Sequence, residues 1–174
     1  MLDNKLIEKL KKIKVLAMDV DGTLTDSSMY YSENGEELKR FSTRDGMGIT
    51  LLKKVGIKTI LITSENSIIA KKRAEKLQID TIILGTKNKS QDLLNYSKIN
   101  DISLEEIAYI GDDINDEHVM KICGFSSCPN DAVDSIKEIV DYISRFNGGN
   151  GAVREICELI LTAQNKSIKL TENW

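Results

Sequence analysis

Short apolar runs alternate with amphipathic segments along most of the chain. The runs are four to six residues long and rich in β-branched residues, as in buried strands, whereas the segments between them repeat apolar residues every three or four positions, as in helices. This alternation predicts an α/β fold in which helices cover both faces of a parallel sheet. Strands are expected at 15–19, 58–63, 81–84, 107–110, 124–128 and 140–143, and helices at 3–12, 45–56, 66–77, 88–96, 115–121, 132–137 and 152–163.

The segment 27–41 departs from this alternation. Two strand-like runs, 29–31 and 37–41, flank the turn sequence Glu33-Asn34-Gly35, which predicts a small β-hairpin flap over the loop that follows the first strand. The segment is too short for a separate cap domain, so residues 1–174 are expected to form a single domain. The polar tail 164–174 has no core pattern and is expected to fray or to dock on a partner.

Composition excludes several classes of protein. The 174 residues carry a net charge of −3, with Lys and Arg dispersed among Asp and Glu, so no broad basic surface for nucleic acid is expected. No apolar run approaches the roughly 20 residues that span a bilayer, and the first residues lack a signal-peptide pattern. We therefore expect a cytoplasmic protein that binds neither nucleic acid nor membrane. The three cysteines form no CxxC or CxxH pattern and are expected to be small buried hydrophobic residues.

The first strand ends in two carboxylates, Asp19 and Asp21, followed by Gly22 and Thr23. Unpaired carboxylates are costly at the end of a buried strand, so these groups should meet a cation, backbone donors or a reacting group. Two acids one residue apart favour a hard metal ion and proton transfer. The alternative is an ordinary acidic turn, since Asp-Gly is a common turn signal.

Three further strands end in polar groups, which the expected fold brings to the same edge because ligands of open parallel sheets bind outside the carboxyl ends of the strands. Such a set suits phosphoryl transfer, which needs a cation, donors for the phosphate, a nucleophile and an acid for the leaving group. Thr63 can donate its hydroxyl to a phosphate oxygen. Lys89 can supply positive charge, and Asp116 can orient that lysine.

The carboxylates divide the remaining work. Asp19 can attack phosphorus to give an aspartyl phosphate, while Asp21 can protonate the leaving oxygen and later activate water. Asp19 and Asp112, with Asp21 and a backbone carbonyl beside them, make an oxygen-rich metal site that fits Mg²⁺.

In order and spacing these residues resemble the four motifs of the haloacid dehalogenase superfamily of aspartate-nucleophile phosphatases. The motifs are Asp19-x-Asp21-Gly22-Thr23, Thr63, Lys89 and Gly111-Asp112-Asp113-x-x-Asp116, and the second aspartate of the first motif marks the phosphatase branch. The resemblance implies a three-layer α/β/α, Rossmann-like fold of the capless type. The stretches 41–46 and 148–155 further resemble the 3-deoxy-D-manno-octulosonate 8-phosphate phosphatase family, which implies a homotetramer whose hairpins and tails complete neighbouring active sites.

One position departs from that family. Where its members usually carry Gly-Arg after the hydroxyl residue of the second motif, this chain has Ser64-Glu65, which reverses the charge offered to an acidic sugar. Glu65, together with Arg73 and Lys76 on the next helix, resembles the subgroup that acts on nine-carbon keto acids such as 2-keto-3-deoxynononate 9-phosphate or a sialic acid 9-phosphate. Arg73 and Lys76 could hold the substrate carboxylate, in the same subunit or across a subunit boundary. The alternative for these two residues is a solvated helix face.

The leading hypothesis is therefore a Mg²⁺-dependent phosphatase of a nine-carbon sugar acid. The alternatives are an octulosonate 8-phosphate phosphatase, a noncatalytic module that partners a sugar-activating cytidylyltransferase, and a phosphotransfer signalling domain. The complete set of motif residues argues against the noncatalytic module, and Asp21, which promotes hydrolysis of a phosphoaspartate, argues against signalling.

Overall fold

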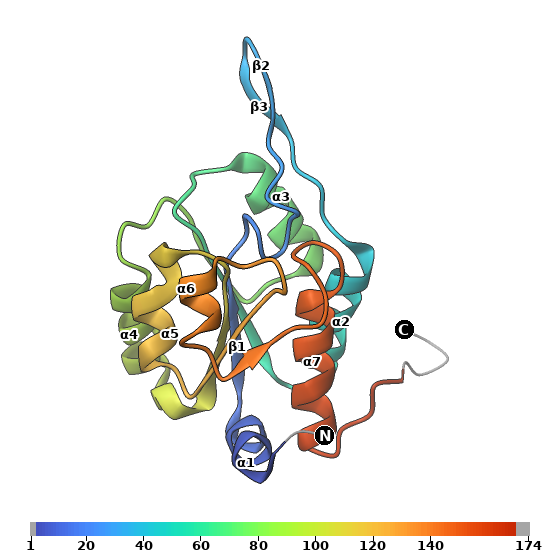
Figure 1. The fold of residues 1–174 in the computed structure, drawn as a ribbon, viewed down its shortest axis with the longest axis vertical. Coiled ribbons are helices and arrows are strands. Elements are labelled where there is room, and N and C mark those ends of the chain that lie inside the picture. The colour runs from blue at the N-terminus through green and yellow to red at the C-terminus, as the bar shows by residue number, and fades with distance from the viewer. Residues whose placement is uncertain (1–2, 170–174) are drawn as a thin grey trace.

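A six-stranded parallel sheet forms the centre of the structure, a computed structural model that describes residues 3–169 (Figure 1). The strand order is β5-β4-β1-β6-β7-β8. β1 lies between β4 and β6 and is buried along its whole length, so the loop that follows it opens at the middle of the sheet edge. The strands are β1 (Val15–Met18), β4 (Lys58–Ile62), β5 (Thr81–Ile83), β6 (Ile107–Ile110), β7 (Phe125–Cys128) and β8 (Tyr142–Ile143).

Helices cover both faces of this sheet. They are α1 (Asn4–Lys12), α2 (Thr43–Lys54), α3 (Ile68–Leu77), α4 (Lys89–Asn100), α5 (Glu117–Ile122), α6 (Asp134–Lys137) and α7 (Ala152–Ala163), with short 3₁₀ turns at Leu104–Glu106 and Ile114–Asp116. Alternate residues of β1 enter two cores: Leu16 and Met18 pack with α1, α2, α3 and α7, while Val15 and Ala17 pack with α4, α5 and α6. The expected three-layer α/β/α fold is confirmed.

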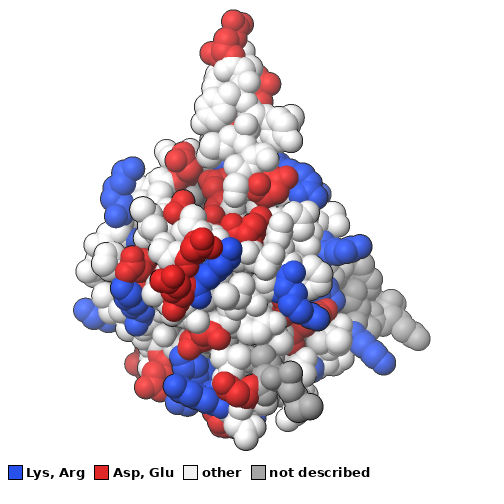
Figure 2. All heavy atoms as spheres, viewed as in Figure 1, with Lys and Arg blue, Asp and Glu red and all other residues white. Residues whose placement is uncertain are grey.

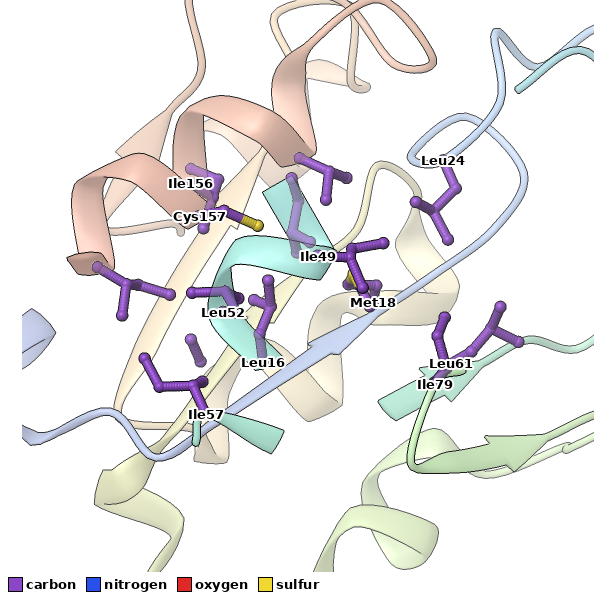
Figure 3. Close-up of a cluster of buried hydrophobic side chains, with 14 of the residues drawn as sticks. Leu16, Met18, Leu24, Ile49, Leu52, Ile57, Leu61, Ile79, Ile156 and Cys157 are labelled. Atoms are coloured by element: carbon purple, nitrogen blue, oxygen red, sulfur yellow. The ribbon is translucent and has the colours of Figure 1, made fainter. Parts of the chain in front are cut away.

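Figure 3 shows the first of these cores, in which Leu16 and Met18 of β1 meet Leu52 of α2 and Cys157 of α7. Burying each large aliphatic side chain contributes about 1.5–3 kcal/mol, so this core anchors the strand that carries the acidic loop. All three cysteines are free; Cys128 and Cys157 are buried as expected, whereas Cys123 is only half-buried. Burial raises the pKa of the Cys128 thiol to about 11.

The hairpin forms a separate two-stranded sheet that projects from the carboxyl edge of the main sheet (Figure 1). Its strands, β2 (Tyr30–Ser32) and β3 (Gly35–Leu38), are antiparallel. The expected strand 37–41 is displaced, because the turn falls one residue earlier and Gly35, with φ +108°, already belongs to β3. No cap domain occurs within residues 3–169.

The helix expected at 45–56 begins earlier than predicted. The side chain of Ser42 caps α2 by accepting the backbone N–H of Asp45 at 3.4 Å, so the helix starts at Thr43. Asp45, at which the helix was expected to begin, lies inside the first turn of α2. Its carboxylate accepts the backbone N–H groups of Gly151 and Arg154, at 3.3 and 2.8 Å, and so connects α2 to the first turn of α7.

Other boundaries also differ from the expected ones. α4 continues to Asn100, whereas the expected strand 140–143 narrows to the two residues of β8. The start of the tail 164–174 docks on its own chain, because the Gln164 amide donates to the backbone oxygens of Leu10 and Ile13 at 3.0 and 2.7 Å. Residues 170–174 lie outside the described residues. Between residues 3 and 169, no helix has the length and apolar character needed to cross a membrane.

Candidate active site

The loop after β1 turns sharply and packs against the loop after β6. The carbonyl of Val20 accepts the backbone N–H groups of Thr23, Leu24 and Thr25, which closes the turn. Gly22 takes φ +86°, and a Cβ atom there would lie 1.9 Å from Oδ2 of Asp112. Only glycine therefore permits the close approach of the two acidic loops.

Lys89 joins the ends of two strands beneath this loop. Its ammonium donates to Oδ1 of Asp19 and to Oδ1 of Asp116, both at 2.7 Å, and all three side chains are buried. Asp116 also accepts the hydroxyl of Tyr109 at 2.6 Å and, through Oδ2, the backbone N–H of Asp112 at 3.0 Å. Both oxygens of Asp116 are thus engaged by the protein, which fixes the position of Lys89.

Three carboxylates converge beside Lys89. One oxygen from each of Asp19, Asp112 and Asp116 lies within 4.8 Å of the others. Burial, and then repulsion from Asp19 and Asp116, raises the pKa of Asp112 to about 8. Burial and repulsion from Asp116 raise the pKa of Asp19 to about 7, despite the opposing charge of Lys89.

A divalent cation would relieve this repulsion, and a donor set made only of oxygen suits Mg²⁺. Because both oxygens of Asp116 already accept hydrogen bonds, Asp19 and Asp112 are the better placed metal ligands. Asp112 is oriented by the Thr23 hydroxyl at 3.1 Å. The Asp21 side chain, expected beside the metal, is not a member of this carboxylate group and is bound to Lys39 instead.

Asp19 and Asp112 line the floor of a cleft of about 240 Å³, while Asp116 is buried next to it. In Figure 2 acidic side chains gather at the foot of the hairpin, above this edge of the sheet. The buried Thr63 hydroxyl accepts the backbone N–H of Glu65 at 3.1 Å, so its own proton remains to be donated. The cleft is lined by Asp19, Asp21, Ser27, Met29, Thr63, Ser64, Glu65, Asp112, Asp113 and Asn115.

Of the three expected substrate contacts, only Glu65 lines the cleft. Arg73 is directed to the other side of α3, where it donates to the backbone oxygen of Ser42 at 3.1 Å and stacks over the Phe41 ring at 5.7 Å from its centroid. Lys76 is exposed on the surface of α3. The structure therefore does not bring Arg73 and Lys76 to the cleft of their own chain.

The foot of the hairpin carries a buried ion network. Lys39 directly follows β3, and its ammonium lies 2.5 Å from Oδ1 of Asp21 and 2.6 Å from Oε1 of Glu36. Glu36 also accepts the hydroxyl of Ser67 at 2.7 Å. Burial alone would lower the pKa of Lys39, but the hydrogen bonds to Asp21 and Glu36 raise it above its usual value.

Sequence reasoning missed Tyr109 and Lys39. Tyr109 lies in an apolar strand run and has the pattern of a core residue, while Lys39 has the pattern of an exposed charge on a hairpin. Only the position of Tyr109, two residues before Gly111-Asp112, could have linked it to the site. Nothing in the sequence places Lys39 under Asp21.

Comparisons with known proteins show which family the chain resembles. Residues 64–156 match a family described as haloacid dehalogenase-like hydrolase. The chain is 38% identical over 160 residues to the 3-deoxy-D-manno-octulosonate 8-phosphate phosphatase of Haemophilus influenzae, which covers 92% of this chain and 89% of the relative. It is 39% identical over 164 residues to the Escherichia coli (strain K12) phosphatase of the same name, which covers 92% and 86%.

Solved structures show the same similarity. The 3-deoxy-D-manno-octulosonate 8-phosphate phosphatase of Moraxella catarrhalis, in complex with a magnesium ion, a phosphate ion and KDO, superposes with a TM-score of 0.91, 41% identity and 94% coverage of each chain. The cobalt-bound enzyme from Haemophilus influenzae superposes with a TM-score of 0.89 and 38% identity, over 91% of this chain and 93% of that one.

Proposed function

The chain belongs to the haloacid dehalogenase-like hydrolases and is a phosphoric monoester hydrolase, and we propose that its substrate is a nine-carbon keto-deoxy sugar acid phosphate. A Mg²⁺-dependent phosphatase of sugar acids fits both the relatives and the carboxylate group. The observation that carries the catalytic part is the buried Lys89, held between Asp19 and Asp116, next to a cleft that Asp19, Thr63 and Asp112 line.

In the proposed mechanism a carboxylate oxygen of Asp19 attacks phosphorus while the ester P–O bond breaks, which leaves an aspartyl phosphate. Asp21 gives a proton to the departing alkoxide and then takes one from the water that hydrolyses the aspartyl phosphate. Thr63 and Lys89 hold the phosphate oxygens. Asp19 and Asp112 would hold Mg²⁺, whose positive charge would stabilise the transferring phosphoryl group.

Glu65 supports the nine-carbon substrate. An anion at the mouth of the cleft disfavours a second carboxylate near the reacting phosphate and suits a hydroxyl or amino group. The relatives favour the alternative, since those named here act on an eight-carbon ester.

The small size of the cleft suggests that a second copy of the chain contributes residues to substrate binding. Its volume of about 240 Å³ lies below the range of about 300–1,000 Å³ that is typical of ligand pockets. We infer that Arg73 and Lys76 of the partner subunit close the cleft and bind the substrate carboxylate, in a homotetramer. Light scattering of the purified protein tests this assembly, and a monomer at assay concentration would contradict it.

A substrate panel tests the proposed function. We expect kcat/KM in saturating Mg²⁺ to be at least about tenfold higher for 2-keto-3-deoxynononate 9-phosphate or N-acetylneuraminate 9-phosphate than for 3-deoxy-D-manno-octulosonate 8-phosphate. Glu65→Arg should shift this ratio toward the eight-carbon ester. Clear preference of the wild-type protein for the eight-carbon ester would overturn the role given to Glu65. Failure to hydrolyse any phosphate ester would revive the noncatalytic module.

A further inference from the structure

Lys39 differs from the residues around it. The hairpin that it follows is exposed, with Tyr31 and Leu38 at 66% and 62% exposure, yet the Lys39 side chain has 0% exposure. It points away from solvent and toward the acidic loop after β1. A buried ion pair is often no more stabilising than apolar residues of the same volume, so hairpin stability alone does not account for this arrangement.

The contacts of Lys39 connect three parts of the molecule. Its ammonium binds Asp21 on one side and Glu36 of β3 on the other. Glu36 accepts from Ser67, whose side chain also caps α3 by accepting the backbone N–H of Ala70 at 3.4 Å. Asp21 is thus tied to the hairpin and, through it, to the start of a helix that packs on the main core.

The two oxygens of Asp21 have different environments. Oδ1 accepts from Lys39, whereas Oδ2 is buried and has no hydrogen-bond partner in the described part of the chain. Asp21 lines the cleft, and a buried carboxylate oxygen without a donor is costly unless a ligand satisfies it. The arrangement keeps one oxygen of Asp21 engaged and leaves the other without a partner in the described part of the chain.

We propose that Lys39 is a positioning residue for phosphoryl transfer: from the foot of the hairpin it holds Oδ1 of Asp21 and leaves Oδ2 to exchange a proton with the leaving group. This inference rests on the proposed role of Asp21 as general acid. It makes the hairpin part of the catalytic apparatus of its own chain, because Lys39 and Glu36 both belong to that segment. Fixing a side chain in its reacting geometry is a recognised source of rate enhancement.

Lys39→Met tests this role with two substrates. p-Nitrophenyl phosphate has a good leaving group that needs little protonation, whereas a sugar-acid phosphate releases a poor alkoxide that needs an acid. We expect Lys39→Met to lower kcat/KM about 10- to 100-fold for whichever eight- or nine-carbon ester the wild-type protein hydrolyses faster. The loss for p-nitrophenyl phosphate should stay below about threefold. Because kcat/KM reports only the steps through formation of the aspartyl phosphate, the second half-reaction does not obscure the comparison.

Several controls separate this role from a structural one. Asp21 and Glu36 retain 24% and 17% side-chain exposure, so water can solvate them in Lys39→Met and the variant is expected to fold. Lys39→Arg keeps the charge and should recover part of the lost selectivity. Lys121→Met, which removes an exposed lysine paired with Glu117, should leave kcat/KM unchanged for both substrates. All assays use saturating Mg²⁺, so that altered metal affinity cancels in the ratio of the two substrates.

The outcomes distinguish the inference from the proposed function. Equal losses for both esters in Lys39→Met, or no loss, would overturn the positioning role. Asp21→Asn is the reference: it should impair the sugar ester at least as selectively as Lys39→Met does. If Asp21→Asn impairs both esters equally, then the role of Asp21 as general acid is wrong, and the inference falls with it. If only Asp21→Asn is selective, the general acid stands and Lys39 does not position it.

Discussion

The cleft floor and the hairpin above it are built in opposite ways. At the floor, Lys89 forms buried salt bridges with Asp19 and Asp116, and strands and helices of the same chain hold all three side chains in place. The hairpin instead exposes Tyr31 and other large apolar side chains, and Lys39 at its base joins it to Asp21 of the acidic loop. The proposed chemistry thus rests mainly on buried groups that a single chain fixes, with Lys39 at the base of the hairpin positioning Asp21, whereas substrate choice is expected to depend on a segment that stands outside the core.

The largest expected effect tests whether the floor carries the reaction. Asp19→Asn removes the proposed nucleophile but keeps its shape, so kcat/KM should fall by about 10⁴-fold or more. The circular dichroism spectrum and the cooperativity of melting should be retained. Asp134→Asn, at a residue whose side chain is 98% exposed and does not line the cleft, serves as the control and should keep most activity. Wild-type turnover by Asp19→Asn would show that the reaction lies elsewhere.

Stability separates the two regions next. Lys89→Met leaves Asp19 and Asp116 without their shared cation and should lower the free energy of unfolding by about 3–5 kcal/mol, measured in urea at pH 8. The matched change Lys121→Met breaks an exposed pair with Glu117 and should cost less than about 1 kcal/mol. Equal losses of unfolding free energy in the two variants would mean that the buried salt bridges of Lys89 do not stabilise the floor.

The pH dependence of stability reports the repulsion among the carboxylates. The pKa values of Asp19 and Asp112 are raised to about 7 and about 8, so between about pH 4 and pH 8 the folded protein holds more protons than the unfolded chain. The metal-free protein should therefore lose stability as the pH rises, most steeply between about pH 5 and pH 7, where both carboxyl groups are protonated in the folded protein and ionised in the unfolded chain. Saturating Mg²⁺ should flatten this profile, because metal binding displaces the protons.

Thermal melting with and without Mg²⁺ checks this prediction. Asp112→Asn should weaken both the pH dependence and the stabilisation by Mg²⁺. A metal-free melting temperature that stays constant or rises from about pH 5 to pH 7 would contradict the account of the floor.

The smallest expected effect on stability belongs to the hairpin. Tyr31→Ser should change the free energy of unfolding of the chain by less than about 0.5 kcal/mol, because the side chain is 66% exposed. If the hairpin completes a neighbouring active site, the same change should raise KM for the sugar-acid ester by about fivefold, equivalent to about 1 kcal/mol. Unchanged KM with an unchanged assembly in light scattering would argue that the hairpin tip takes no part in binding.

The same contrast explains what could be predicted from the sequence. Asp19, Thr63 and Asp112 were predictable because each follows a buried strand, and the ends of parallel strands meet at one edge. The alternation of apolar runs likewise predicted the layers. These inferences depend on the local spacing of apolar and polar residues, which can be read directly from the sequence.

Contacts between distant segments were not predictable in this way. Lys39 reaches Asp21 because the chain returns to the acidic loop at the base of the hairpin. Asp45 accepts a backbone N–H group at the start of α7 and does not cap its own helix. Arg73 contacts Phe41 and Ser42 and not the cleft. Helical spacing shows that Arg73 and Lys76 share a face of α3, but it does not show which part of the molecule that face contacts. Each of these outcomes depends on tertiary packing, to which spacing along the chain gives no access.

The most direct test of the central claim is to locate the phosphoryl group during turnover. The protein is mixed with Mg²⁺ and its preferred sugar-acid phosphate, quenched in acid within milliseconds, digested and examined by mass spectrometry. We predict one phosphoryl group on the peptide that contains Asp19, absent when Asp19→Asn is treated in the same way. A phosphoryl group on another peptide, or its formation in Asp19→Asn, would contradict the claim that the buried floor carries the reaction.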